Sequence, residues 1–109
     1  MTLKEILDKC GSLEIAQRRS IEDENAEIVV YNKDISEWDK LLTDILGAAI
    51  KPAGVEPSED YTALAKDHGG IYKKQTLYKK DFDSGSVMAM FWPWQDNIRT
   101  TLKMIVLKK

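Results

Sequence analysis

The sequence predicts an α+β fold, with an antiparallel sheet of four or five strands and two or three helices packed on one face. Two observations support this fold class. Apolar residues recur at three- and four-residue intervals over 35–46, and the last third of the chain contains three long strand-like runs separated by short turns. A chain of 109 residues is one domain by size. We therefore expect residues 1–109 to form a single domain.

The N-terminal region predicts one short helix and at least one strand. Leu3, Ile6, Leu7 and Cys10 share one side of a helix over 3–10. Residues 12–25 fit either a strand or a helix, and the acidic run at 22–25 has the composition of a solvated turn. The β-branched run at 27–31 predicts a strand.

The helix predicted over 35–46 has the clearest pattern in the chain. Its apolar residues are Ile35, Trp38, Leu41, Leu42, Ile45 and Leu46. Polar residues, among them Asp39 and Thr43, occupy the other side, and Gly47 supplies a stop. This helix must therefore lie against an apolar surface.

After a loop with two prolines at 51–57, Ser58 is placed to cap a helix over 58–68 that ends at Gly69-Gly70. The remainder predicts a three-stranded meander with strands at 71–80, 86–94 and 98–107. Turns at 83–85 and 95–97 would join these strands.

Charge is divided unevenly along the chain. Residues 1–70 carry eight Lys/Arg against fifteen Asp/Glu, a net of −7, whereas residues 71–109 carry eight against three, a net of +5. Such a split indicates a charged partner, or two parts of the fold that attract each other. Alternating aromatic and basic residues at Tyr72, Lys74, Tyr78 and Lys80 suit single-stranded nucleic acid. A sequence pI near 5.4 argues against a dedicated nucleic-acid binder.

No motif of catalytic, cofactor or metal-binding grade occurs in the sequence. Cys10 is the only cysteine, and its place on an apolar helix face predicts a buried, inert thiol. His68 is the only histidine, and a position at a helix C-terminus accounts for it without chemistry. We expect no metal and no cofactor. The first residues lack the apolar core of a secretory signal, and the longest apolar stretch, 87–93, is too short to cross a bilayer. We therefore expect a cytoplasmic protein without membrane association.

The predicted second strand of the meander is apolar on both faces. Met88, Met90, Trp92 and Trp94 lie on one face, and Val87, Ala89 and Phe91 lie on the other. Helices can cover only one face well in so small a domain, so some of these side chains should be exposed or covered by a ligand. Met and Trp are typical of adaptable binding surfaces. The alternative is that Met88, Met90 and Trp92 are core residues beneath the helix over 35–46.

These observations favour a non-catalytic binding or accessory module. Its apolar Met/Trp sheet face would contact a protein partner, a second copy of the chain or an apolar ligand. The candidate binding residues are Trp92, Trp94, Met88, Met90, Tyr78 and Arg99. Single-stranded nucleic-acid binding on the basic C-terminal sheet is the first alternative, and a small enzyme using His68 is the second.

Overall fold

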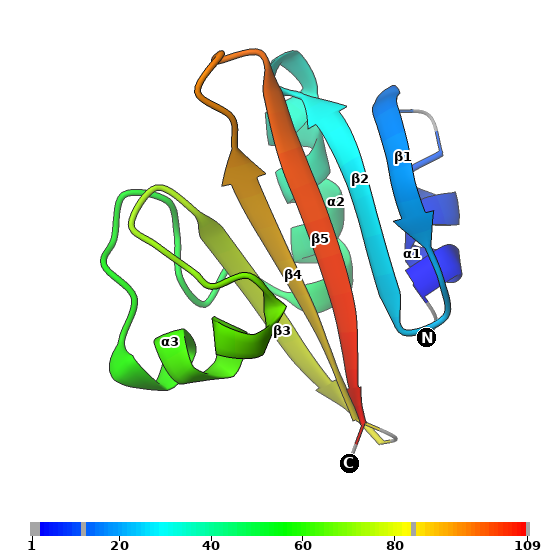
Figure 1. Cartoon of the computed structure of the whole chain (residues 1–109). Helices are drawn as coiled ribbons and strands as arrows, with labels where there is room; N and C mark the ends of the chain where they lie inside the picture. Colours follow the sequence, from blue (N-terminus) through cyan, green and yellow to red (C-terminus); the bar gives the residue numbers. More distant parts are fainter. Residues whose placement is uncertain (1–2, 12, 84, 109) are drawn as a thin grey trace.

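The computed structural model describes residues 3–11, 13–83 and 85–108. It contains a five-stranded antiparallel sheet with strand order β1-β2-β5-β4-β3, which confirms the predicted α+β class (Figure 1). The strands are β1 (Ile15–Ile21), β2 (Asn25–Tyr31), β3 (Thr76–Phe82), β4 (Gly85–Pro93) and β5 (Arg99–Lys108). The helices are α1 (Leu3–Lys9), α2 (Ile35–Leu46) and α3 (Glu59–Ala65), with single 3-10 turns at Asn32–Asp34 and Lys66–His68.

The C-terminal meander is present as predicted, and the ambiguous segment before β2 is a strand. β1 and β2 form a hairpin closed by the Glu22 N–H, which donates to the Asn25 carbonyl over 2.8 Å. β2 then pairs with β5, so the last strand occupies the centre of the sheet. The acidic run at 22–25 is the turn of this hairpin, which keeps its carboxylates in solvent.

α1 and α2 cover one face of the sheet, behind the strands in Figure 1. Trp38, Leu42 and Leu46 of α2 pack with Leu3 and Ile6 of α1 in the larger core cluster. The sheet contributes alternate residues to this core: Ala26, Ile28, Val30, Tyr78, Val87, Ala89, Phe91, Leu102 and Met104. The 3.6-residue period of α2 and the two-residue period of the strands therefore meet in one core, as the sequence predicts.

α3 lies on the opposite face of the sheet from α1 and α2. The sequence had suggested that the helix over 58–68 could pack on the same face as the other two helices. Ala65 of α3 packs with Leu77, Met88 and Met90 in a second, smaller core. Two connections, 47–58 before α3 and 69–75 after it, carry the chain around the β3 edge to this face and back (Figure 1). The sheet is therefore covered on both faces beside β3 and β4.

β3 begins at Thr76, five residues later than the predicted strand at 71–80. The intervening residues form a turn in which the Gln75 N–H donates to the Tyr72 carbonyl over 3.1 Å. Lys51 pairs with Leu77 in an isolated antiparallel bridge, which covers the start of the β3 edge. β3 ends at Phe82 and β4 begins at Gly85. Ser84 of the predicted turn lies outside the described residues.

Candidate functional site

A cleft of about 690 Å³ opens between α2 and the β3–β4 hairpin, on the face that α1 and α2 cover. Ala48, Ala49, Pro52 and Ala53, which have small side chains, form one wall of this cleft. Its lining residues are Ile35, Ser36, Asp39, Thr43, Ala48, Ala49, Pro52, Ala53, Lys74, Thr76, Tyr78, Phe91, Pro93 and Thr100. Half of these fourteen residues are apolar, and they supply most of the exposed lining surface.

A buried phenol and a carboxylate form the polar centre of this cleft. The Tyr78 hydroxyl donates a hydrogen bond to Asp39 Oδ1, and the Tyr78 ring packs edge-on against Phe91 with centroids 5.7 Å apart. Tyr78 is fully buried, whereas Asp39 is exposed on α2. Burial raises the pKa of the Tyr78 phenol above its ordinary value, and the hydrogen bond to Asp39 raises it further. Tyr78 is therefore a fixed, neutral hydrogen-bond donor at physiological pH, which suits orientation of a carboxylate rather than proton transfer.

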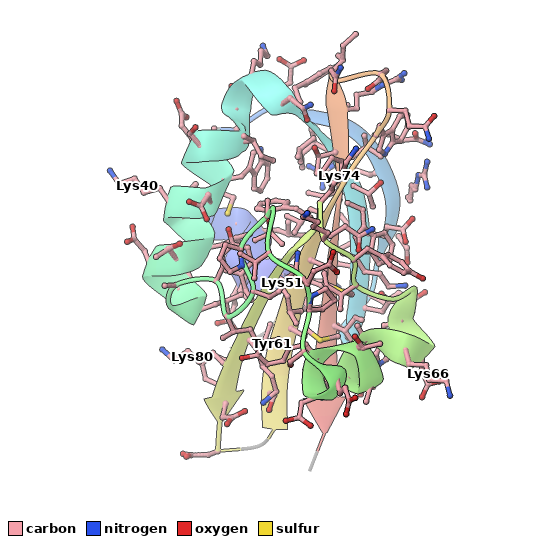
Figure 2. All side chains as sticks on the ribbon, turned by 90° about the vertical axis from the view of Figure 1, so that its left-hand side faces the viewer. Lys40, Lys51, Tyr61, Lys66, Lys74 and Lys80 are labelled. Carbon is pink, nitrogen blue, oxygen red and sulfur yellow. The ribbon has the colours of Figure 1, made fainter. Side chains whose placement is uncertain are left out.

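The loop at the mouth of the cleft is held by a buried lysine. The Lys51 ammonium donates to the carbonyl oxygens of Tyr72 and Lys73 over 2.7 and 2.8 Å, and also to that of Gln75. In Figure 2, Lys51 lies in the interior, while Lys40, Lys66 and Lys80 extend from the edges of the molecule. Burial lowers the pKa of Lys51, and the negative charge of Glu56 opposes that shift. Lys51 therefore acts as an internal cation that fixes residues 72–75.

The predicted site residues separate onto two faces of the sheet. Tyr78 lies at the cleft, but Met88 and Met90 belong to the small core beneath α3 and are fully buried. Trp92 and Trp94 are half-buried on the α3 side. The expected continuous Met/Trp surface is therefore not exposed, because α3 covers its methionine end. The binding roles assigned to these residues stay predictions.

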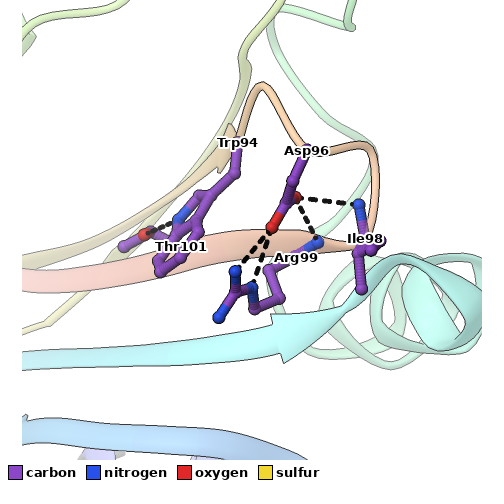
Figure 3. A network of polar contacts seen from close by, with 5 residues as sticks. All are labelled: Trp94, Asp96, Ile98, Arg99 and Thr101. Carbon is purple, nitrogen blue, oxygen red and sulfur yellow. Dashed lines mark hydrogen bonds and ion pairs between the residues drawn. The ribbon is translucent and has the colours of Figure 1, made fainter.

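Arg99 and Trp94 lie together at the β4–β5 turn (Figure 3). The Arg99 guanidinium carbon lies 4.4 Å from the centroid of the Trp94 ring, and Trp94 Nε1 donates to Thr101 Oγ1 over 2.8 Å. Asp96 accepts from the Ile98 N–H, and from both the backbone and the guanidinium of Arg99. The Ile98 N–H, with Arg99, holds the pKa of the Asp96 carboxyl below its usual value. The turn and the tryptophan are thus fixed by one polar network.

His68 and Cys10 do not come together at a site. Cys10 lies in the α1–α2 core, is 2% exposed, and has its pKa raised by burial to about 11, as expected of an inert thiol. His68 ends the 3-10 turn after α3, on the other face of the sheet, and does not line the cleft. Among the described residues, no group of three or more His, Cys, Asp or Glu side chains is placed to hold a metal ion.

Sequence reasoning missed most of the cleft lining. One signal was available on α2, where Ser36, Asp39 and Thr43 are spaced by three and four residues and share a stripe beside the apolar side. We placed Asp39 and Thr43 on the polar side of the helix, where such residues usually face solvent, and did not consider Ser36. The wall formed by Ala48, Ala49 and Ala53 has no sequence signal, because it depends on where the loop crosses the sheet edge.

None of the described helices is both long and apolar enough to span a membrane. Comparison of the chain with protein-family models, with curated proteins and with solved structures returned no match.

Proposed function

We propose that this chain is a non-catalytic binding module that takes a small, mainly apolar ligand in the cleft between α2 and the β3–β4 hairpin. The observation that carries the proposal is the cleft itself. Its volume of about 690 Å³ lies within the ordinary range for small-molecule sites, about 300–1,000 Å³. A mostly apolar lining with a few convergent polar groups is also typical of such sites.

The polar groups of the cleft suggest what else the ligand carries. Tyr78 engages one oxygen of the Asp39 carboxylate, and Asp39 is exposed. A ligand N–H or O–H donor can therefore bind this carboxylate while the apolar body of the ligand packs on Ile35 and Phe91. The hydroxyls of Ser36 and Thr43 lie on the same wall and offer further hydrogen bonds.

The proposal moves the binding surface to the opposite face of β4 from the one favoured by the sequence. Phe91 and Pro93 line the cleft, whereas the methionines on the other face are core residues. Binding of a protein partner or of a second copy of the chain to the Met/Trp face of the sheet stays a prediction. We place the activity in the cytoplasm, where a single buried thiol such as Cys10 stays reduced.

A neutral apolar dye with one N–H group, N-phenylnaphthylamine, tests this proposal through its fluorescence. We expect a saturable rise in emission with the wild-type chain. Ala48→Phe should abolish the rise because the new ring would enter the cleft, and Ala63→Phe is the matched control because Ala63 is exposed on α3. Circular dichroism would establish that both variants fold. An unsaturable wild-type signal, or equal signals from the wild type and Ala48→Phe, would overturn the proposal.

A further inference from the structure

Two aromatic side chains line a second groove, on the other side of the 72–75 loop from the cleft. This groove encloses about 720 Å³ between that loop and the β4–β5 turn. Tyr72 is 65% exposed, which is unusual for so large an apolar ring, and Trp94 is half-buried opposite it. The full lining consists of Tyr72, Lys73, Lys74, Gln75, Pro93, Trp94, Gln95 and Asn97.

The charge of this groove has one sign. Lys73 and Lys74 line it, and no Asp or Glu does. Within the part of the chain that the structure describes, neither lysine forms an ion pair. The nearby acid of the turn, Asp96, is paired with Arg99 over 2.8 Å. The groove therefore complements an anionic partner, although the whole chain has a net charge of −2.

Basic and aromatic residues continue from the groove across the sheet face. Arg19 of β1 and Arg99 lie 5.6 and 4.4 Å from the Trp94 ring centroid, and these arginines are ion-paired with Glu27 and Asp96 respectively. Further along, the Lys103 ammonium lies 5.5 Å from the ring centroid of Trp92. These contacts extend the aromatic and basic surface from Trp94 to Trp92, which lies outside the groove lining, and this favours a polymer with repeated negative charge and flat apolar groups.

The groove is fixed before any partner binds. Three carbonyl groups of its loop are held by Lys51, and the Tyr72 N–H donates to Gln75 Oε1 over 2.9 Å. On the opposite wall, the bond from Trp94 Nε1 to Thr101 sets the plane of the indole. A rigid site loses less conformational entropy on binding, so modest contacts give useful affinity.

We propose that this groove binds single-stranded nucleic acid, with bases stacked on Tyr72 and Trp94 and phosphates paired with Lys73 and Lys74. Stacking on aromatic rings beside a basic track is how proteins bind single strands without reading their sequence. Tyr72 and Lys74 belong to the set of residues that the sequence suggested, whereas Tyr78 of that set is buried on the opposite face of the sheet. The groove shares Lys74 and Pro93 with the α2 cleft, but neither Tyr72 nor Trp94 lines the cleft and Ala48 does not line the groove, so each proposal can fail alone.

Fluorescence anisotropy of a labelled oligothymidylate of about ten nucleotides tests the proposal, since single-strand sites span about 4–16 nucleotides. The wild type should bind at low salt, with an affinity that falls as salt rises. Tyr72→Ala should weaken binding by about 5- to 150-fold, as expected for the loss of one stacked base. The double variant Lys73→Gln/Lys74→Gln should reduce the salt slope by about 1.4, at about 0.7 for each phosphate contact of a single strand.

A second double variant, Lys40→Gln/Lys80→Gln, is the matched control because both lysines are exposed and neither lines the groove (Figure 2). We expect it to bind as the wild type does. The proposal is overturned if no oligomer binds at low salt, or if the control weakens binding as much as the groove variant. It is also overturned if a mononucleotide, or a duplex of the same length, binds as tightly as the single strand.

Discussion

The substitution Lys51→Met tests how far the buried ammonium holds the loop between the two candidate sites. Methionine keeps an unbranched apolar side chain of similar length, so the packing around the lysine stem is retained. The change removes only the charged group, which is 1% exposed and donates to the carbonyls of Tyr72, Lys73 and Gln75. Residues 72–75 would then lose their only cationic partner among the described side chains.

The expected loss of stability depends on which of the three carbonyl groups keep a backbone donor when the ammonium is removed. The Lys73 carbonyl still accepts from the Gly54 N–H over 2.7 Å, and the Tyr72 carbonyl still accepts from the Gln75 N–H. Hydrogen bonds to charged groups contribute about 1.5–3 kcal/mol each. Losing all three bonds from Lys51 is partly offset, because the variant no longer has to bury a charged ammonium. We therefore expect a loss of about 2–4 kcal/mol. That is a large part of the 5–15 kcal/mol that holds a typical domain together.

Urea denaturation followed by tryptophan fluorescence measures this cost, with Lys73→Met as the control. The Lys73 side chain is exposed, so its loss should change the free energy of unfolding by less than about 0.5 kcal/mol. By thermal unfolding, Lys51→Met should lower Tm by roughly 8–16 °C, at about 4 °C per kcal/mol for a domain of this size. If Lys51→Met and Lys73→Met have the same stability, the ammonium does not organise the loop and our reasoning is refuted.

Three further predictions concern backbone strain and buried ionisable groups. Gly69→Ala should destabilise the fold more than Gly54→Ala, because both positions have positive φ but only the Cβ at 69 would meet Trp92, 2.5 Å from its Cη2. Gly54→Ala should cost about 1–2 kcal/mol in urea denaturation from backbone strain alone, and equal losses would contradict the contact. Because the folded state raises the pKa of Tyr78, the buried neutral phenol contributes its full stability below pH 10.0. This contribution is lost as pH rises from 10.0 through the folded pKa. Tyr78→Phe should therefore flatten the alkaline loss of stability, and an unchanged pH profile would show that the phenol is not buried. Cys10 should react with a thiol-specific aromatic disulfide reagent only after the chain unfolds. Prompt reaction of the native chain would contradict the position of Cys10 in the core.

The sequence predicted those helices and strands in which apolar residues recur at the spacing of the buried face. The helix over 35–46 and the meander were found because each buries one regular face, and the repeat of that face is visible in the chain. The start of β3 was misplaced because Tyr72, Lys73 and Lys74 alternate like a strand, yet Lys51 draws their carbonyls into a turn. A tertiary contact from 21 residues away has no local signal.

The two candidate sites were predicted only in part. Trp94, Arg99 and Tyr78 were singled out for being aromatic or basic on long strands. Tyr78 lines the cleft and Trp94 lines the groove, whereas Arg99 lines neither and lies against the Trp94 ring. Met88 and Met90 were assigned to a surface because both faces of β4 are apolar, but the sequence did not show that α3 would lie over them. Which helix covers which face depends on the path of the two connections around the β3 edge, and residue patterns do not encode that path.

The most direct test of our central claim, that the space between α2 and the β3–β4 hairpin is an open binding site, is an NMR titration of the chain with N-phenylnaphthylamine. We predict saturable amide shift changes at Asp39, Thr43 and Thr76, which line the cleft, with little change at Gln95 or Asn97 in the groove. Shift changes that are absent, spread over the whole chain or confined to the groove would contradict it.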